Sequence, residues 1–301
     1  HNVRFVGGAV LGQRAAWDAG TNIAGIRLYG ACSGVRIKDM RFEDLSSNAI
    51  GLFGEAGQRI TDVRIRDVTV RNCSNVYGDY LSDVKGPAEG SVREDQGGVA
   101  CYHVDDWVVD GCLFATSQSD GTHFYHSHRG HFVNNQVLGS QMGGYFLEGC
   151  QHVLAANNRI AGNGSRGVTI ERDSMYCTLA DNIVEHSGRE GLWAPDVMAV
   201  MVTGNIFREN GRKDDTRRDC EIRIDEGERF ETETRDVIIA GNLFYTTAHQ
   251  TAAVLVTQGV REAVVRNNAF RGEVEDEYVR IEDGVEGCVV AGNNAANCAQ
   301  R

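Results

Sequence analysis

Apolar and polar residues alternate in short runs along this chain, and the runs return at a nearly constant interval. One run opens at Gly98, and four more open in the same way after 23, 23, 23 and 24 residues, at Gly121, Gly144, Gly167 and Gly191. Alternation over four or five residues is typical of a β-strand with one buried face. A fixed period of this length indicates a solenoid, in which each repeat stacks on the next.

A column of asparagines marks a second position in the repeat, directly after short apolar runs such as Val153–Ala156 and Val200–Thr203. Asparagine tolerates a left-handed backbone at a bend, and stacked asparagines form amide ladders. We interpret the column as evidence for architecture and not for catalysis. It contains Asn135, Asn158, Asn182, Asn205, Asn242, Asn268 and Asn293.

Each repeat supplies three short strands and three turns, and about 23 residues for one turn fits a right-handed parallel β-helix. We therefore predict an all-β chain, with residues 1–301 forming a single domain of ten to eleven turns. A leucine-rich repeat would need a regular leucine pattern, which the sequence lacks. Strand-like alternation already begins at residues 1–5, so we expect an N-terminal cap to be missing.

Three stretches break the period with polar or glycine-rich sequence, at 77–96, 211–219 and 226–235. In solenoids such insertions map to loops on one side, often beside the binding face.

Composition argues against some classes of function. The formal net charge of −12 argues against nucleic-acid binding, and no apolar run is long enough to span a membrane. Nine cysteines are an odd number and are not grouped in CxxC pairs. We expect buried thiols in the core and not disulfides or a zinc ribbon.

The segment Asn157–Val168 resembles the repeat of alginate C5-epimerase modules, in the β-helix superfamily that also holds pectate-lyase-like enzymes and phage tailspikes. The likeness covers nearly the whole chain as a repeat signal. The chain lacks the Tyr-Gly-Phe-Asp-Pro-His motif of those epimerases; the corresponding turn, Gly98–His103, keeps a histidine and has no aspartate. It also lacks the Asn-Thr-Asp, Asp-Asp and Gly-His-Gly set of polygalacturonases. The resemblance implies a carbohydrate-active enzyme that is secreted or at the cell surface.

Two outward-facing columns emerge when the repeats are aligned, because side chains alternate along a strand. We expect the two columns to share one exposed face, with successive turns about 4.8 Å apart. The first holds Arg27, Gly51, Ala100, His123, Phe146, Thr169, Trp193, Arg223, Leu255 and Arg280, and the second Tyr29, Phe53, Tyr102, Tyr125, Glu148, Glu171, Pro195, Asp225, Thr257 and Glu282.

Aromatic rings beside carboxylates and histidines suit a sugar chain, whose apolar faces stack and whose hydroxyls take hydrogen bonds. Such a face also fits the plainer interpretation of a salt-bridged outer ladder. The candidate catalytic residues are His123, Tyr125, His126, Glu148, Glu171, Arg172 and Asp225, and the candidate substrate-binding residues are Tyr102, His128, Phe146, Asp173, Trp193 and Arg223.

The leading hypothesis is a uronate-polysaccharide lyase or C5-epimerase. Removal of the C5 proton needs a base, a proton donor to the glycosidic oxygen, and a group that neutralises the sugar carboxylate. A His/Tyr group supplies the base and the donor, and Arg172 or Arg223 neutralises the carboxylate. The only lysines, Lys38, Lys85 and Lys213, lie off this face.

Two alternatives stay open. A glycoside hydrolase would use paired carboxylates: Glu148 and Glu171 on adjacent turns suggest retention, and Glu171 with Asp225, two turns apart, suggests inversion. Like charges on adjacent turns would raise the pKa of one glutamate, unless Arg172 or His126 neutralises the pair. The other alternative is a non-catalytic or tailspike-like module that only grips a glycan.

Three of the nine histidines fall within residues 123–128, which raises the question of a metal site. No third ligand is evident, so we predict no metal in the site, although a divalent cation such as calcium stays open. The expected partner is a polysaccharide or oligosaccharide, with no nucleic acid and no membrane. A homo-oligomer is left open.

Overall fold

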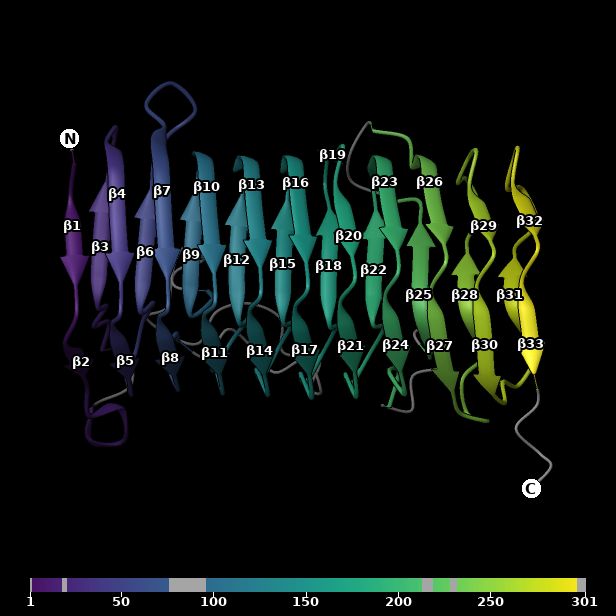
Figure 1. The fold of residues 1–301 in the computed structure, drawn as a ribbon, viewed down its shortest axis with the longest axis horizontal. Coiled ribbons are helices and arrows are strands. Elements are labelled where there is room, and N and C mark those ends of the chain that lie inside the picture. The colour runs from purple at the N-terminus through teal and green to yellow at the C-terminus, as the bar shows by residue number, and fades with distance from the viewer. Residues whose placement is uncertain (1, 18–20, 76–95, 213–218, 228–231, 297–301) are drawn as a thin grey trace.

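The computed structural model describes residues 2–17, 21–75, 96–212, 219–227 and 232–296. Its strands form three parallel sheets that run the length of the molecule, and each turn of the chain adds one strand to each sheet. Figure 1 shows the turns side by side along the long axis, from the purple N-terminal end to the yellow C-terminal end. This is the predicted parallel β-helix.

The first sheet contains twelve strands among the described residues, two of them on one turn. These are β1 (Arg4–Val6), β4 (Ser33–Lys38), β7 (Ile60–Arg66), β10 (Val104–Asp110), β13 (His128–Val133), β16 (Gln151–Ala156), β19 (Ser174–Met175), β20 (Thr178–Ala180), β23 (Val197–Thr203), β26 (Arg235–Ala240), β29 (Val264–Arg266) and β32 (Val289–Ala291).

The second sheet contains eleven strands in the same ranges. These are β2 (Ala9–Leu11), β5 (Arg41–Glu43), β8 (Thr69–Arg71), β11 (Leu113–Ala115), β14 (Gln136–Leu138), β17 (Arg159–Ala161), β21 (Ile183–Glu185), β24 (Ile206–Arg208), β27 (Leu243–Thr246), β30 (Ala269–Gly272) and β33 (Asn294–Ala296). A short 3₁₀-helix, η1 (Arg14–Ala16), comes after β2.

The third sheet has ten strands within the described part of the chain, in agreement with ten to eleven turns. These are β3 (Ile26–Tyr29), β6 (Ile50–Phe53), β9 (Val99–Tyr102), β12 (Thr122–Tyr125), β15 (Tyr145–Glu148), β18 (Val168–Glu171), β22 (Leu192–Pro195), β25 (Cys220–Asp225), β28 (Ala252–Val256) and β31 (Glu277–Ile281).

The asparagine column forms the predicted ladder. Asn182 donates from its backbone and its side-chain nitrogen to Oδ1 of Asn205, at 2.9 Å in each case, and its own Oδ1 accepts the same pair of bonds from Asn158. Its side-chain nitrogen also reaches the carbonyl of Ala155. Each asparagine therefore satisfies backbone groups at the bend between the first and second sheets.

Apolar residues from all three sheets fill the interior as one continuous core. The eight cysteines in the described ranges are free thiols, and six of them are buried, as expected; the ninth, Cys298, lies outside those ranges. Of the expected insertions, residues 77–95, 213–218 and 228–231 also lie outside the described residues. The expected missing N-terminal cap stays a prediction. No helix in the described part of the chain is long and apolar enough to cross a membrane.

Candidate functional site

The outer face of the third sheet carries the two predicted columns in the predicted register. His123 pairs with Phe146, and Phe146 pairs with Thr169 on the next strand. Trp193 then pairs with Arg223. The second column runs in parallel from Tyr102 through Tyr125, Glu148 and Glu171. The sequence alignment of the repeats therefore places the candidate residues correctly along the sheet.

The expectation that this whole face is exposed is wrong. His123 has no exposed surface, and Glu148 and Glu171 are each 4% exposed. The cause is contact between neighbouring strands: the His123 ring stacks on the half-buried Phe146 ring, with centroids 4.5 Å apart and planes 3° apart, and Tyr102 packs against its other side. A ligand on this face therefore cannot touch His123 directly.

A chain of polar contacts links these buried groups. Oη of Tyr102 lies 3.2 Å from Nδ1 of His123, and Nε2 of His123 lies 3.3 Å from Oε2 of Glu148. Arg172 binds both glutamates, at 2.6 Å to Glu148 and 3.0 Å to Glu171. Of the two groups considered for neutralising the like-charged pair, Arg172 or His126, Arg172 forms ion pairs with both glutamates.

Beside this chain, three half-buried rings form a ridge, which we call the Tyr125 ridge: Tyr125, His126 and His103. The Tyr125 and His126 rings meet edge to face with centroids 4.3 Å apart, and the His103 and His126 rings stack at 5.4 Å. Burial, and the Arg59 guanidinium among the nearby charges, lower the pKa of both His103 and His126. Both imidazoles are therefore neutral at neutral pH and can accept a proton.

His103 and His126 of the ridge lie at the corners where β9 and β12 of the third sheet end. His103, His126, Gly149, Arg172 and Asp196 all have positive φ at such corners, between 45° and 62°. This left-handed step turns the chain into the first sheet and directs the corner side chain back along the outer face. Glycine, histidine and aspartate take such a step at moderate cost.

Sequence reasoning missed His103 and Arg59. His103 could have been found, because it comes directly after Tyr102 as His126 comes after Tyr125. Arg59 had no periodic signal; it comes after an irregular turn and binds Asp105 at 2.6 Å and the carbonyl of His126.

His128, a candidate substrate-binding residue, lies on the first sheet and not on the third. It opens β13 of the first sheet, beyond the corner, where its Nδ1 accepts the backbone N–H of Gln151. Burial, with Arg59 nearby, lowers its pKa to about 4. Asp173 also lies past the corner, where it accepts a hydrogen bond from Thr232. Neither position supports a role as a sugar-binding residue on the third sheet.

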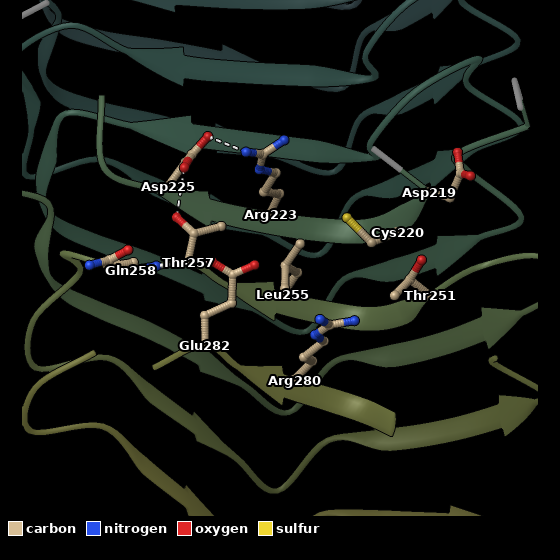
Figure 2. Close-up of a pocket in the computed structure, with 10 residues that line it drawn as sticks. All are labelled: Asp219, Cys220, Arg223, Asp225, Thr251, Leu255, Thr257, Gln258, Arg280 and Glu282. Atoms are coloured by element: carbon tan, nitrogen blue, oxygen red, sulfur yellow. Dashed lines mark hydrogen bonds and ion pairs between the residues drawn. The ribbon is translucent and has the colours of Figure 1, made fainter. Parts of the chain in front are cut away.

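The remaining candidates, Trp193, Arg223 and Asp225, form a second group farther along the same face. Figure 2 shows Arg223 and Asp225. Asp225 accepts hydrogen bonds from Trp193 at 3.3 Å and from Thr257 at 2.6 Å, and Arg223 binds it at 2.8 Å. The guanidinium of Arg166 lies 3.8 Å from the centroid of the Trp193 ring. Asp225 is separated from Glu171 by two strand spacings, and these neighbours hold it in place.

Among the described residues, no three histidine, cysteine, aspartate or glutamate side chains come together as ligands for a metal ion.

Comparison with known families agrees with this architecture. The model of the right-handed β-helix region matches residues 97–299, which is more than half of the chain. The chain belongs to this family. A comparison of this β-helix with curated proteins finds no match.

Solved structures with the same fold include the A-module of the mannuronan C-5 epimerase AlgE4 from Azotobacter vinelandii. Its sequence identity to this right-handed β-helix is 14% and the TM-score is 0.66; the match covers 84% of this chain and 64% of the AlgE4 module. An alginate lyase from Paenibacillus sp. str. FPU-7 has 15% sequence identity and a TM-score of 0.52, and the match covers 94% of this chain and 90% of the lyase chain. A DFA-IIIase from Arthrobacter chlorophenolicus A6 has 12% sequence identity and a TM-score of 0.60, and the match covers 86% of this chain and 64% of the DFA-IIIase chain. At these identities the likeness shows the fold.

Proposed function

We propose that this protein is a carbohydrate-active enzyme, and that it acts on a uronate-containing polysaccharide as a lyase or C5-epimerase. The observation that carries the proposal is the Tyr125 ridge, where a phenol lies beside two neutral imidazoles at the half-open edge of the third sheet. Two of the similar structures are a mannuronan C-5 epimerase and an alginate lyase, which supports the same reaction class.

Each residue's role is assigned from the chemistry. His126 removes the C5 proton, because a base must be unprotonated before it acts. Tyr125 then donates a proton. In elimination the proton goes to the glycosidic oxygen as the C4–O bond breaks and the C4–C5 double bond forms. In epimerisation a proton returns to C5 from the opposite face, and no bond of the chain breaks.

Arg172 positions the centre. It binds Glu148 and Glu171, so two buried carboxylates share one guanidinium with 26% of its side chain exposed. The buried Tyr102–His123–Glu148 contacts hold Arg172 in register with Tyr125. His123 is thus a positioning residue in this proposal, and not the base.

The glycoside hydrolase remains a second candidate, because Glu148 and Glu171 are directly paired on adjacent strands. Their 4% exposure and their shared arginine argue against it, since a hydrolytic pair must reach the glycosidic bond. The same face would also serve a non-catalytic glycan-binding module. A secreted or cell-surface location and the absence of a metal stay predictions, and a divalent cation such as calcium and a homo-oligomer stay open.

The test is incubation with a panel of uronate and neutral polysaccharides. Elimination gives ultraviolet absorbance from an unsaturated sugar, epimerisation changes the C5 proton signals in NMR without shortening the chain, and hydrolysis gives reducing ends without unsaturation. Tyr125→Phe and His126→Gln should each lower kcat by about 10²–10⁴-fold. His131→Gln, at an exposed histidine of β13, is the matched control and should stay active. Full activity of both ridge variants would overturn the proposal.

A further inference from the structure

A pocket of about 430 Å³ opens on the outer face of the third sheet, between β25, β28 and β31 (Figure 2). It lies on the same face as the Tyr125 ridge but on different strands. From β12 to β25 is four strand spacings, or about 19 Å at about 4.8 Å per strand. None of the acid–base groups of the ridge lines it.

The register of the three strands gives the pocket an ordered lining. Leu255 lies between Arg223 and Arg280 in one column. In the neighbouring column Thr257 donates to Asp225, and Glu282 lies on the next turn. Figure 2 shows the half-buried Leu255 side chain at the centre of the pocket, with the polar side chains around it.

The two guanidinium groups of the lining are already paired with carboxylates of the protein. Arg223 binds Asp225 at 2.8 Å and lies 3.9 Å from Glu190, and Arg280 binds Asp276 at 2.7 Å. Asp219, Asp225 and Glu282 give the lining three carboxylates against two guanidinium groups. An anionic ligand would meet a surplus of negative charge there.

An apolar centre surrounded by fixed donors and acceptors suits an uncharged polyhydroxyl ring. The C–H face of a sugar can cover Leu255, while its hydroxyls bond the carboxylates and guanidinium groups at the rim. We propose that this pocket binds an uncharged sugar unit of the chain whose uronate unit lies at the Tyr125 ridge. The location of the reaction centre rests on the proposed function. The substrate is then a heteropolysaccharide with neutral and uronate units, long enough to span both sites.

Isothermal titration calorimetry on the whole protein tests the pocket without any reaction. The probes are neutral hexasaccharides of (1→4)-linked glucose, mannose and xylose, and the hexasaccharide of mannuronate. We expect at least one neutral probe to bind. Leu255→Asp should weaken it about tenfold or more, because the variant removes apolar contact and places a charge in the pocket.

Leu243→Asp in β27, at a half-buried leucine on the second sheet, is the matched control for folding and should leave binding unchanged. Arg280→Gln keeps a hydrogen-bond donor and removes the charge. The affinity for the neutral probe should therefore change by no more than about twofold. If the pocket instead binds a carboxylate, the affinity for the mannuronate hexasaccharide should fall about tenfold or more. Leu255→Ala, which removes apolar contact and adds no charge, covers the case in which Leu255→Asp fails to fold and should also weaken neutral binding.

The proposal is overturned if no neutral probe binds, if neutral binding is unchanged in the Leu255 variants, or if Arg280→Gln weakens mannuronate binding selectively. Failure of the proposed function is a separate result. If the protein has no activity on uronate polysaccharides but still binds a neutral probe in a Leu255-dependent way, the proposed sugar pocket stands and the proposed reaction centre is refuted.

Discussion

Removal of one rung of the asparagine ladder should destabilise the β-helix far more than a surface substitution does. Asn182 is 1% exposed, and its side chain serves the backbone N–H of Asn158, the carbonyl of Ala155 and the amides of the rungs on either side. Asn182→Ala removes the acceptor of that N–H and one donor to that carbonyl. Each lost buried bond of this kind costs about 1–3 kcal/mol, so we expect a loss of about 2–6 kcal/mol in the free energy of unfolding.

The control is the last described rung. Asn293 makes the same bonds, to Asn268 and to the carbonyl of Val265, but it is only half-buried. Water can replace its side chain, so Asn293→Ala should cost about 1 kcal/mol or less. Urea unfolding followed by circular dichroism measures both variants. If the two losses are equal, or if Asn182→Ala costs under about 1 kcal/mol, buried amide pairing is not what holds the turns together.

Three further predictions concern pH and packing. The pKa of His128 is about 4 when folded and 6.5 when unfolded, so the unfolded chain binds the extra proton between these values. The free energy of unfolding should therefore fall as the pH drops from 6.5 to about 4. His128→Gln should make the melting temperature fall less over this range, and an unchanged dependence on pH would contradict the argument. Asp196 behaves in the opposite sense, because burial and then Glu226 raise its pKa from 3.8 to about 6, and stability is lost as the pH rises through that window. Asp196→Asn should raise the melting temperature at neutral pH and not at acid pH; equal shifts at both would point to packing instead. Finally, a Cβ at Gly130 would lie 1.9 Å from the buried Trp107 ring, whereas a Cβ at Gly57 meets nothing within 4 Å. Gly130→Ala should therefore cost about 1–3 kcal/mol or more and Gly57→Ala almost nothing, and similar melting temperatures for the two would refute the packing argument.

The fold was predictable because one signal repeats many times. The glycine starts and the asparagine column each recur on successive turns, so an error at one turn is corrected by the others. Register is then determined, and with it the order of His123, Phe146 and Trp193 along the third sheet. The structural role of the asparagine column was also predictable from the residue type alone.

The state of the site was less predictable, because exposure depends on contacts between turns and not on alternation. The pattern placed the His123 side chain on the outer face of the sheet, which is correct. Neighbouring side chains, among them the rings of Tyr102 and Phe146, bury it there. Arg59 reaches His126 from an irregular turn that no period describes. His128 lies on the first sheet because the left-handed residue His126 ends the strand of the third sheet and directs the next residues into another sheet.

The left-handed corners at the ends of the third-sheet strands have a consequence for engineering. At one geometric position the coil accepts imidazole, guanidinium, carboxylate or no side chain at all, as His126, Arg172, Asp196 and Gly149 show. The asparagines and the core determine the winding, so the corner side chain can differ from turn to turn where it tolerates positive φ and has room. Gly149 has no such room, because a Cβ there would lie 2.6 Å from Nδ1 of His126. A library at the other corners would present different functional groups at a spacing set by the rise of the coil.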